Sequence, residues 1–261
     1  MVIKAKPVAT ATSPKRSHLL KVYGKLAGAY RRHIGELSRT RSSASAAVRV
    51  LAKANEDFER VLMENLGVTG LPVVGVDAPA PAGAHWLIVP LTSQRNALYA
   101  RDPICAGVAF IEKDGTCPIG VIYFPQDDMC VIAEAGHGVV AEPLGRLRSA
   151  TRTELDDTLA LVPWKTADVV EMDLLKVLDA QSIHTRKTGN TLADVFDVAC
   201  GRADMAIATR VNRLESYLAN LIMAESAGFA SDMKGKPLGP DSTTLVIANP
   251  KLHSKVVGLL K

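Results

Sequence analysis

Apolar residues recur every three or four positions in the first quarter of the chain, and this spacing is typical of amphipathic helices. It predicts a helix over residues 17–37, with Ser17 as its N-cap, and a second helix over about 46–66 that ends at Gly67. Small and polar residues separate the two. Because each pattern leaves one apolar stripe, we expect both helices to pack on one face of a sheet.

After Gly70 the pattern changes to short apolar runs that are bounded by turn residues, which is typical of strands. Two of these runs flank Asp114 and Gly115, a pair that favours a tight hairpin turn. The runs continue to residue 142 with bends at glycines. This region predicts a mainly antiparallel sheet.

The last 110 residues alternate strand-like and helix-like segments, which indicates an α/β half with a partly parallel sheet. We therefore expect three parts. Residues 1–16 are predicted to be a disordered basic extension, 17–150 an N-terminal α+β half, and 151–261 a C-terminal α/β half. The seam is expected near residues 146–153.

Composition narrows the class of protein. Hydrophobic residues make up 48% and charged residues 22%, as in ordinary globular proteins. No apolar run reaches the roughly 18 residues of a membrane span, and the N-terminus lacks the apolar core of a secretory signal, so we expect a cytoplasmic protein. The four cysteines form no C-x-x-C pair, which predicts reduced thiols rather than a zinc or redox site.

Charge is unevenly distributed along the chain. Residues 1–60 hold 13 Lys and Arg against 4 Asp and Glu, a net charge of +9, whereas the remainder has a net charge of −5. Such a segment attracts RNA, anionic lipid or an acidic protein. The simpler alternative is a solvated helix face. Aromatic residues are not interleaved with the basic ones as they are in single-strand binders.

Three segments carry a specific resemblance. Residues 120–142 read GVIYFPQDDMCVIAEAGHGVVAE, residues 188–207 read TGNTLADVFDVACGRADMAI, and residues 221–238 read LIMAESAGFASDMKGKPL. In order and spacing they resemble the inositol monophosphatase family. The resemblance implies an α/β fold that forms a five-layered αβαβα sandwich, a homodimer, and Mg²⁺-dependent hydrolysis of phosphate monoesters.

In that reaction Mg²⁺ ions neutralise the phosphate dianion and generate hydroxide, and a ring of carboxylates holds the ions. The family's metal-binding strand, W-I-x-D-P-[IL]-D-G-T-x-N-[FY], corresponds to residues 86–97. Both of its aspartates are replaced here, by Val89 and Thr92. The metal-binding glutamate of the upstream G-E-E corresponds to Val76, and Asp77 beside it is expected to point to the other face of a strand.

Most of the family's remaining acidic positions are also replaced in this chain. The family's functional aspartate on the second helix corresponds to Asn55, and a glutamate that contacts substrate corresponds to Ala208. The last metal-binding aspartate corresponds to Glu215, which is the one acid left among the ligand positions. We therefore expect no catalytic residues of the usual kind and no cofactor. Asp77 and Glu215 remain weak candidates for holding Mg²⁺ in a rearranged site.

Anion binding is the other chemistry that these segments suggest. Ser93, Gln94 and Arg95 are expected at a helix N-terminus, where backbone amides favour phosphate. The residues Gly189, Asn190 and Thr191 correspond to the family's substrate-contacting G-S-A. Two alternatives follow for this pocket. It binds an anionic or phosphorylated ligand without cleaving it, or it is an empty, vestigial pocket.

These observations lead to one hypothesis and two alternatives. The first is a catalytically inactive, phosphatase-like protein that acts as a binding or regulatory protein. The second is a weak Mg²⁺-dependent phosphatase with a rearranged ligand set. The third is a module that binds RNA or a protein partner through residues 1–60.

Overall fold

The computed structural model describes residues 14–40, 43–99, 103–162 and 169–260, apart from the side chains of residues 14, 34, 38, 44, 94 and 95. Two long antiparallel helices begin the chain, α1 (Pro14–Thr40) and α2 (Ala44–Gly67). The prediction that residues 14–16 belong to a disordered extension is wrong, because α1 begins at Pro14 and proline is well tolerated in a first helical turn. Residues 1–13 lie outside the described ranges. Although α1 and α2 are long, no helix in these ranges is apolar enough to cross a membrane.

The first sheet has seven strands that follow one another in chain order. The strands are β1 (Val73–Gly75), β2 (His85–Val89), β3 (Ala106–Ile111), β4 (Ile119–Phe124), β5 (Met129–Glu134), β6 (Gly138–Glu142) and β7 (Gly145–Arg146). Only β1 and β2 are parallel, so the predicted antiparallel sheet is confirmed. The predicted hairpin turn is also present, since Gly115 has φ +84° and the Asp114 carboxylate accepts the Thr116 N–H at 2.9 Å.

The second sheet has five strands in the order β11-β12-β10-β8-β9. They are β8 (Leu159–Val162), β9 (His184–Lys187), β10 (Met205–Ala208), β11 (Phe229–Ser231) and β12 (Leu245–Ala248). Four helices alternate with them: α4 (Val169–Asp179), α5 (Thr191–Ala199), α6 (Arg213–Glu225) and α7 (Pro250–Leu259). Strand β8 is parallel to both β9 and β10, and β12 is antiparallel to its neighbours, which confirms the partly parallel sheet.

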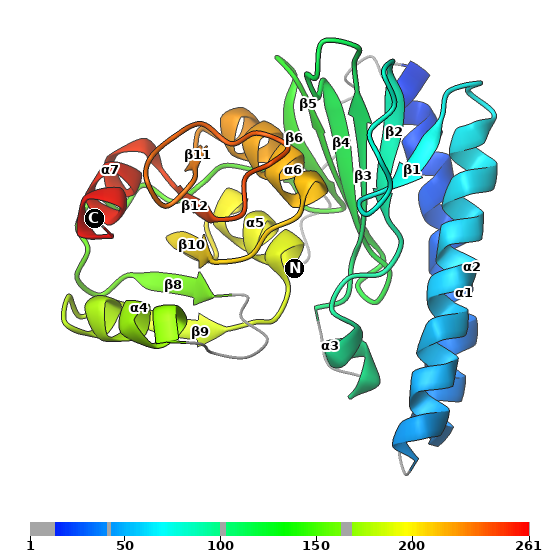
Figure 1. The fold of residues 1–261 in the computed structure, drawn as a ribbon, viewed down its shortest axis with the longest axis horizontal. Helices are drawn as coiled ribbons and strands as arrows, with labels where there is room; N and C mark the ends of the chain where they lie inside the picture. Colours follow the sequence, from blue (N-terminus) through cyan, green and yellow to red (C-terminus); the bar gives the residue numbers. More distant parts are fainter. Residues whose placement is uncertain (1–13, 41–42, 100–102, 163–168, 261) are drawn as a thin grey trace, which may run out of the picture.

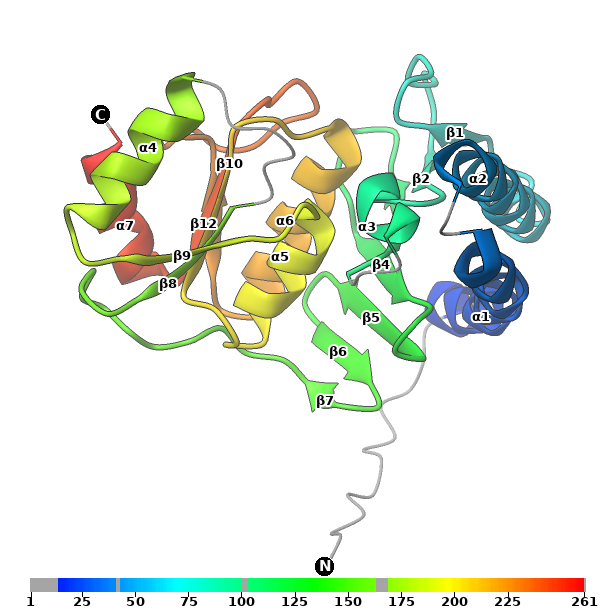
Figure 2. The same cartoon turned by 90° about the horizontal axis from the view of Figure 1, so that it is seen from below.

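The elements stack in five layers, as Figures 1 and 2 show. Helices α1 and α2 cover one face of the first sheet, α5 and α6 lie between the two sheets, and α4 and α7 cover the outer face of the second. Three buried clusters fill the spaces between layers, and the largest joins both sheets to α5 and α6. The expected αβαβα sandwich is therefore observed.

Helix α6 approaches the first sheet closely because two glycines face it. A Cβ added to Gly120 would clash with Leu218 Cδ2, and one added to Gly107 would lie 2.7 Å from Leu214 Cδ2. Both leucines are fully buried. The strands thus leave room for the leucine side chains, and this packing joins the two halves of the molecule.

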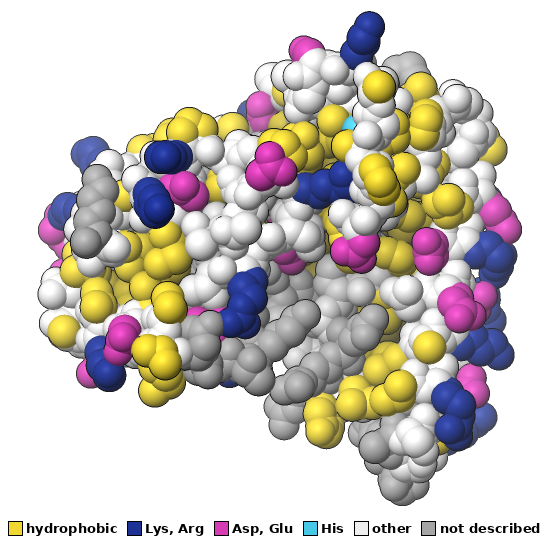
Figure 3. Space-filling model, viewed as in Figure 1, with side chains coloured by type: hydrophobic (Ala, Val, Ile, Leu, Met, Phe, Trp, Pro, Cys, Tyr) yellow, Lys and Arg dark blue, Asp and Glu magenta, His cyan; other side chains and the backbone are white. Residues whose placement is uncertain are grey.

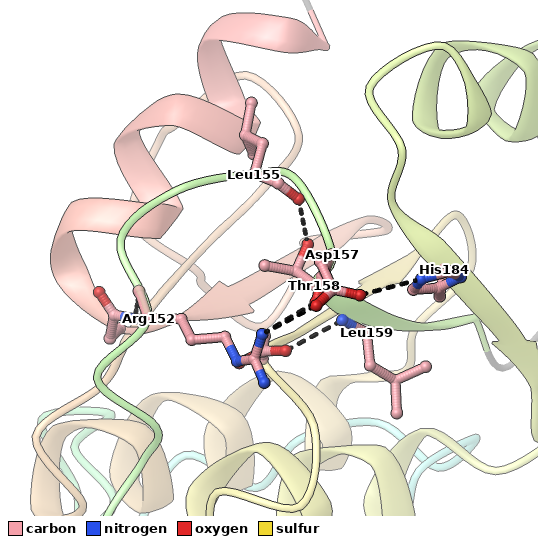
Figure 4. Close-up of polar contacts among 8 residues, drawn as sticks. Arg152, Leu155, Asp157, Thr158, Leu159 and His184 are labelled. Carbon is pink, nitrogen blue, oxygen red and sulfur yellow. Dashed lines mark hydrogen bonds and ion pairs between the residues drawn. The ribbon is translucent and has the colours of Figure 1, made fainter.

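Where the chain enters the second sheet, polar contacts fix the start of β8 (Figure 4). Arg152 donates to the carbonyl oxygen of Asp157 at 2.9 Å and pairs with Asp204 at 3.5 Å. The Asp204 carboxylate also accepts the N–H of Leu159 at 2.9 Å, and His184 contacts the Asp157 carboxylate at 3.2 Å. Side chains from three segments therefore hold β8 beside β9 and β10, just beyond the predicted seam.

Candidate functional site

The family's metal and substrate positions lie where the two halves face each other. One wall comes from the N-terminal half: the turn after β1, the end of β2, and the segment that leads into α3 (Gln94–Leu98). The other comes from the starts of α5 and α6 in the C-terminal half. The candidate residues identified from the family motifs therefore lie on two opposing walls.

Apolar side chains stand at two metal positions of the N-terminal wall. Val76 and Val89 are half-buried and both pack against the core cluster that joins the sheets to α5 and α6. Strand β1 ends at Gly75, so Val76 and Asp77 lie in a turn. The prediction that strand alternation points Asp77 to the opposite face is therefore wrong; Asp77 is exposed in that turn.

Thr92, at a third metal position, uses its hydroxyl for structural hydrogen bonds. Thr92 Oγ1 donates to the Cys105 carbonyl oxygen and accepts the Cys105 N–H, each at 3.1 Å. It also accepts a hydrogen bond from Asn190 Nδ2 at 2.9 Å. With one donor and two acceptor sites, the hydroxyl has its hydrogen-bonding capacity filled by the protein.

Further hydrogen bonds tie the two walls together. The Ser93 hydroxyl donates to the Gly189 carbonyl oxygen. Asn96 Nδ2 donates to the carbonyl oxygens of Thr188 and Pro103, both at 3.1 Å. The bonds to Gly189 and Thr188, together with the bond from Asn190 to Thr92, join segments more than 90 residues apart in the sequence. The loop before α5 is thereby fixed to the loop before α3.

The predicted anion-binding residues are placed in these two loops. Ser93 precedes α3 with φ +54° and is largely buried, and its carbonyl oxygen accepts the Ala97 N–H at 3.1 Å. Gln94 and Arg95 begin α3, which is five residues long, but their side chains lie outside the described part. On the other wall, Asn190 caps α5 by accepting the Ala193 N–H at 3.3 Å, and Thr191 is buried in the first turn. Anion binding by this group stays a prediction.

Glu215, the remaining acid among the metal positions, caps its own helix. Its carboxylate accepts the Asn212 N–H at 2.8 Å, while the Asn212 side chain accepts the Glu215 N–H at 3.0 Å. This capping box satisfies backbone donors at the start of α6. Of the other two positions, Asn55 is half-buried on α2 and Ala208 is buried at the end of β10.

Sequence reasoning missed a buried acid behind this site. Asp194, in the first turn of α5, is 1% exposed; its Oδ2 accepts the Thr188 hydroxyl at 2.9 Å and its Oδ1 has no partner. Burial raises its pKa well above the ordinary range; the Thr188 hydrogen bond opposes this, and the negative charges of Asp197 and Glu215 add to it. An acid between apolar neighbours in a predicted helix was the available signal.

These side chains do not fit a magnesium site of the family's kind. Mg²⁺ requires oxygen ligands in near-octahedral geometry, whereas two of the four ligand positions are valines and the other two are hydrogen-bonded to the protein. Across the part of the chain that the structure describes, no three His, Cys, Asp or Glu side chains gather in a group that could hold a metal ion.

The fold is of the inositol monophosphatase class. Structural comparison supports this class: SuhB, an extragenic suppressor protein from Bartonella henselae, superposes with a TM-score of 0.82 over 95% of this chain and 99% of its own, at 19% identity. Inositol monophosphatase from Anabaena superposes with a TM-score of 0.72 over 94% and 93%, at 17% identity.

Sequence comparison agrees, although no family model matches the chain. Nus factor SuhB from Xylella fastidiosa is 26% identical over 236 residues, which cover 85% of each chain. Inositol-1-monophosphatase from Mesorhizobium japonicum is 27% identical over 184 residues, which cover 68% of this chain and 67% of its own. The chain is therefore similar in sequence to SuhB and inositol-1-monophosphatase proteins and shares the inositol monophosphatase fold.

Proposed function

We propose that this chain is a catalytically inactive member of its family that acts as a binding or regulatory protein. One observation carries the proposal: the four ligand positions hold Val76, Val89, Thr92 and Glu215, and the single carboxylate among them is bonded to the helix it caps. A lone carboxylate does not replace the water that Mg²⁺ holds strongly. Without the ion, neither hydroxide formation nor charge neutralisation at phosphate is available.

Titration calorimetry with Mg²⁺ and Mn²⁺ tests the proposal when it is combined with assays on inositol phosphate, 3′-phosphoadenosine phosphate and fructose bisphosphate. We expect no saturable metal binding and no turnover above background. The matched control is Glu215→Gln, which keeps the size of the side chain. Saturable binding with turnover that Glu215→Gln abolishes would establish the rearranged phosphatase site instead.

A restored ligand set provides the complementary test. Val76→Glu, Val89→Asp, Thr92→Asp and Glu215→Asp together return the carboxylates, and we expect Mg²⁺ binding only in the combined variant. Each single change leaves too few oxygens for the ion. Strong activity from one change alone would contradict this account of the site.

The cleft is proposed to take an anionic or phosphorylated small ligand without cleaving it. Support comes from its placement at the starts of α3 and α5, where backbone amides are directed outward from the helix. Titration with inorganic phosphate, followed by the change in thermal unfolding temperature, is the measurement. Ser93→Ala removes the hydroxyl bond to Gly189 and serves as the variant. An unchanged unfolding temperature at millimolar phosphate favours an empty, vestigial pocket.

We further propose a cytoplasmic homodimer, following the family resemblance. Analytical ultracentrifugation gives the association state directly, and a single species of about 28 kDa would contradict the dimer.

A second candidate function is binding of RNA or a protein partner through residues 1–60. It is favoured by the net charge of +9 in this segment and by the name Nus factor that several relatives carry. Binding through phosphate contacts must weaken steeply as salt increases. A flat salt response would reject an RNA partner and leave a protein partner.

A further inference from the structure

Helix α1 displays a row of basic side chains on its exposed side. Lys21, Lys25, Arg32 and Arg39 are all exposed, and at 3.6 residues per turn they fall within a sector of about 40° around the helix axis. Eighteen residues separate the first from the last, which is a rise of about 27 Å. The four residues therefore form one straight row along the helix, which we call the α1 basic row.

The charge of this row is not neutralised by its surroundings. Within the described ranges, Lys21, Arg32 and Arg39 form no ion pair, and Lys25 donates to the neutral side-chain oxygen of Asn65. Across all of α1 there are seven Lys and Arg against one acid, Glu36. The row thus leaves an excess of positive charge facing solvent.

Helix α2 differs in this respect, although it packs beside α1. Its Arg60 pairs with Asp57 at 3.2 Å and with Glu64 at 3.3 Å. Figure 3 shows basic and acidic side chains interspersed along the edge that the helix pair forms. Of the net charge of +9 in residues 1–60, α1 carries +6.

Two exposed glycines, Gly24 and Gly35, lie beside the row on the same helix. A Cβ added at either would meet no atom within 4 Å, so packing inside this chain does not require glycine there. Glycine lowers helix stability relative to alanine. The two positions leave the backbone bare and let a partner approach α1 closely.

The side chains exposed on this surface indicate which class of partner it binds. Leu19, Leu26 and Leu37 of α1 are buried against α2 and the sheet, so the described side chains of the helix leave no exposed apolar face to insert into a membrane. Tyr23 and Tyr30 are half-buried and lie outside the sector of the row, so bases have no aromatic platform on it. A straight cationic row without stacking groups fits a rigid, regularly charged polyanion.

We propose that the α1 basic row binds the phosphate backbone of double-stranded nucleic acid without reading its sequence. A duplex carries one negative charge per about 1.7 Å of axis, which matches an extended row of cations better than a compact acidic patch does. The inference rests on the proposed binding role of the protein and adds the surface and the class of partner.

The test is fluorescence anisotropy of a labelled duplex of about 20 base pairs with the full chain, over a range of salt concentrations. With four cations in contact, the slope of log K against log salt is expected near −0.9 per contact, or about −3.6 in total. The variant Lys21→Gln/Arg32→Gln/Arg39→Gln should reduce the slope by about 2.7 and the affinity at low salt by at least tenfold.

The matched control is Lys113→Gln/Lys234→Gln/Lys251→Gln, which removes the same net charge from exposed positions outside the helix pair. It should leave the slope nearly unchanged, and circular dichroism should show that both variants are folded. DNA and RNA duplexes should bind within about threefold of each other, because both present phosphates.

An equal loss in the control variant would overturn the proposal, as would a flat salt response. Tighter binding to single strands, to poly-glutamate or to vesicles of anionic lipid would assign the row to a different partner and likewise overturn it. These results are independent of the metal titration, so failure of the row leaves the inactive-site proposal standing.

Discussion

The two walls of the candidate site differ in how their side chains depart from the pattern of an active phosphatase. On the N-terminal wall, acids are replaced by Val76 and Val89, which join the central core. On the C-terminal wall, two acids are present, but Asp194 is buried and Glu215 caps a helix. The N-terminal wall therefore has no charged side chain at these positions. On the C-terminal wall the carboxylates are present, but they form contacts within the protein.

The comparison teaches that an acid in the right segment is not sufficient evidence of a metal site. A carboxylate becomes a ligand only if its oxygens are free and face other oxygens across a wet cleft. In this protein one oxygen of Glu215 accepts the Asn212 N–H, and Asp194 lies in surroundings that favour the neutral form.

Loss of the contact between the two halves of the molecule should have the largest effect. Leu218→Ala removes a fully buried side chain that packs over Gly120 and is expected to lower the free energy of unfolding by about 2–5 kcal/mol. Urea denaturation measures the change. Leu144→Ala, at an exposed position, is the control and should cost far less. Similar losses in both variants would show that α6 does not join the halves as described.

Asp194→Asn should change how stability depends on pH. Because the pKa of Asp194 is raised in the folded state, the folded protein keeps this proton at pH values where the unfolded chain, with a pKa near 3.9, has released it. Wild-type stability therefore falls as pH rises from about 4 through the folded pKa, by about 1.4 kcal/mol for each unit between the two pKa values.

The variant lacks this contribution, so its stability relative to wild type should increase over that pH range. Urea denaturation at several pH values between about 4 and 9 gives the comparison. Asp156→Asn, at an exposed position, should run parallel to wild type. Parallel curves for Asp194→Asn as well would mean that Asp194 is ionised in the folded protein.

Asn190→Ala should loosen the connection between the walls. It removes the bonds from Asn190 Nδ2 to Thr92 and to the Pro103 carbonyl oxygen, and the cap on α5, at an expected cost of about 1–3 kcal/mol. Amide hydrogen exchange should rise in the segments before α3 and α5 more than elsewhere. A uniform rise across the chain would contradict a local connection.

Changing Glu215 should have the smallest effect. Glu215→Ala removes half of the capping box and is expected to cost about 0.5–1 kcal/mol, whereas Glu215→Gln retains an acceptor and should cost less. Thermal unfolding in the presence and absence of Mg²⁺ measures both. If Mg²⁺ stabilised wild type but neither variant, Glu215 would be a metal ligand rather than a cap.

Most helices and strands, and the resemblance to the family, could be predicted from the sequence alone. Apolar periodicity predicted α1 and α2, and the Asp114–Gly115 pair predicted a hairpin. Three motifs carried the family resemblance, and the replaced acids were found by matching further family motifs position by position. These features are local or depend on order along the chain, so they can be read one segment at a time. The start of α1 at Pro14 was missed because the apolar pattern begins later than the helix.

The tertiary structure decided what the remaining polar residues do. Ser93 is hydrogen-bonded to Gly189, 96 residues away in the sequence, and Asn190 is hydrogen-bonded to Thr92, 98 residues away. No local sequence pattern predicts such pairs. Asp194 is an ordinary first-turn acid in the sequence and becomes a buried, partly unpaired group only when the sheets close over α5. The sequence carries residue types and local periods, but which groups lose water and which oxygens remain free is set by packing between distant segments.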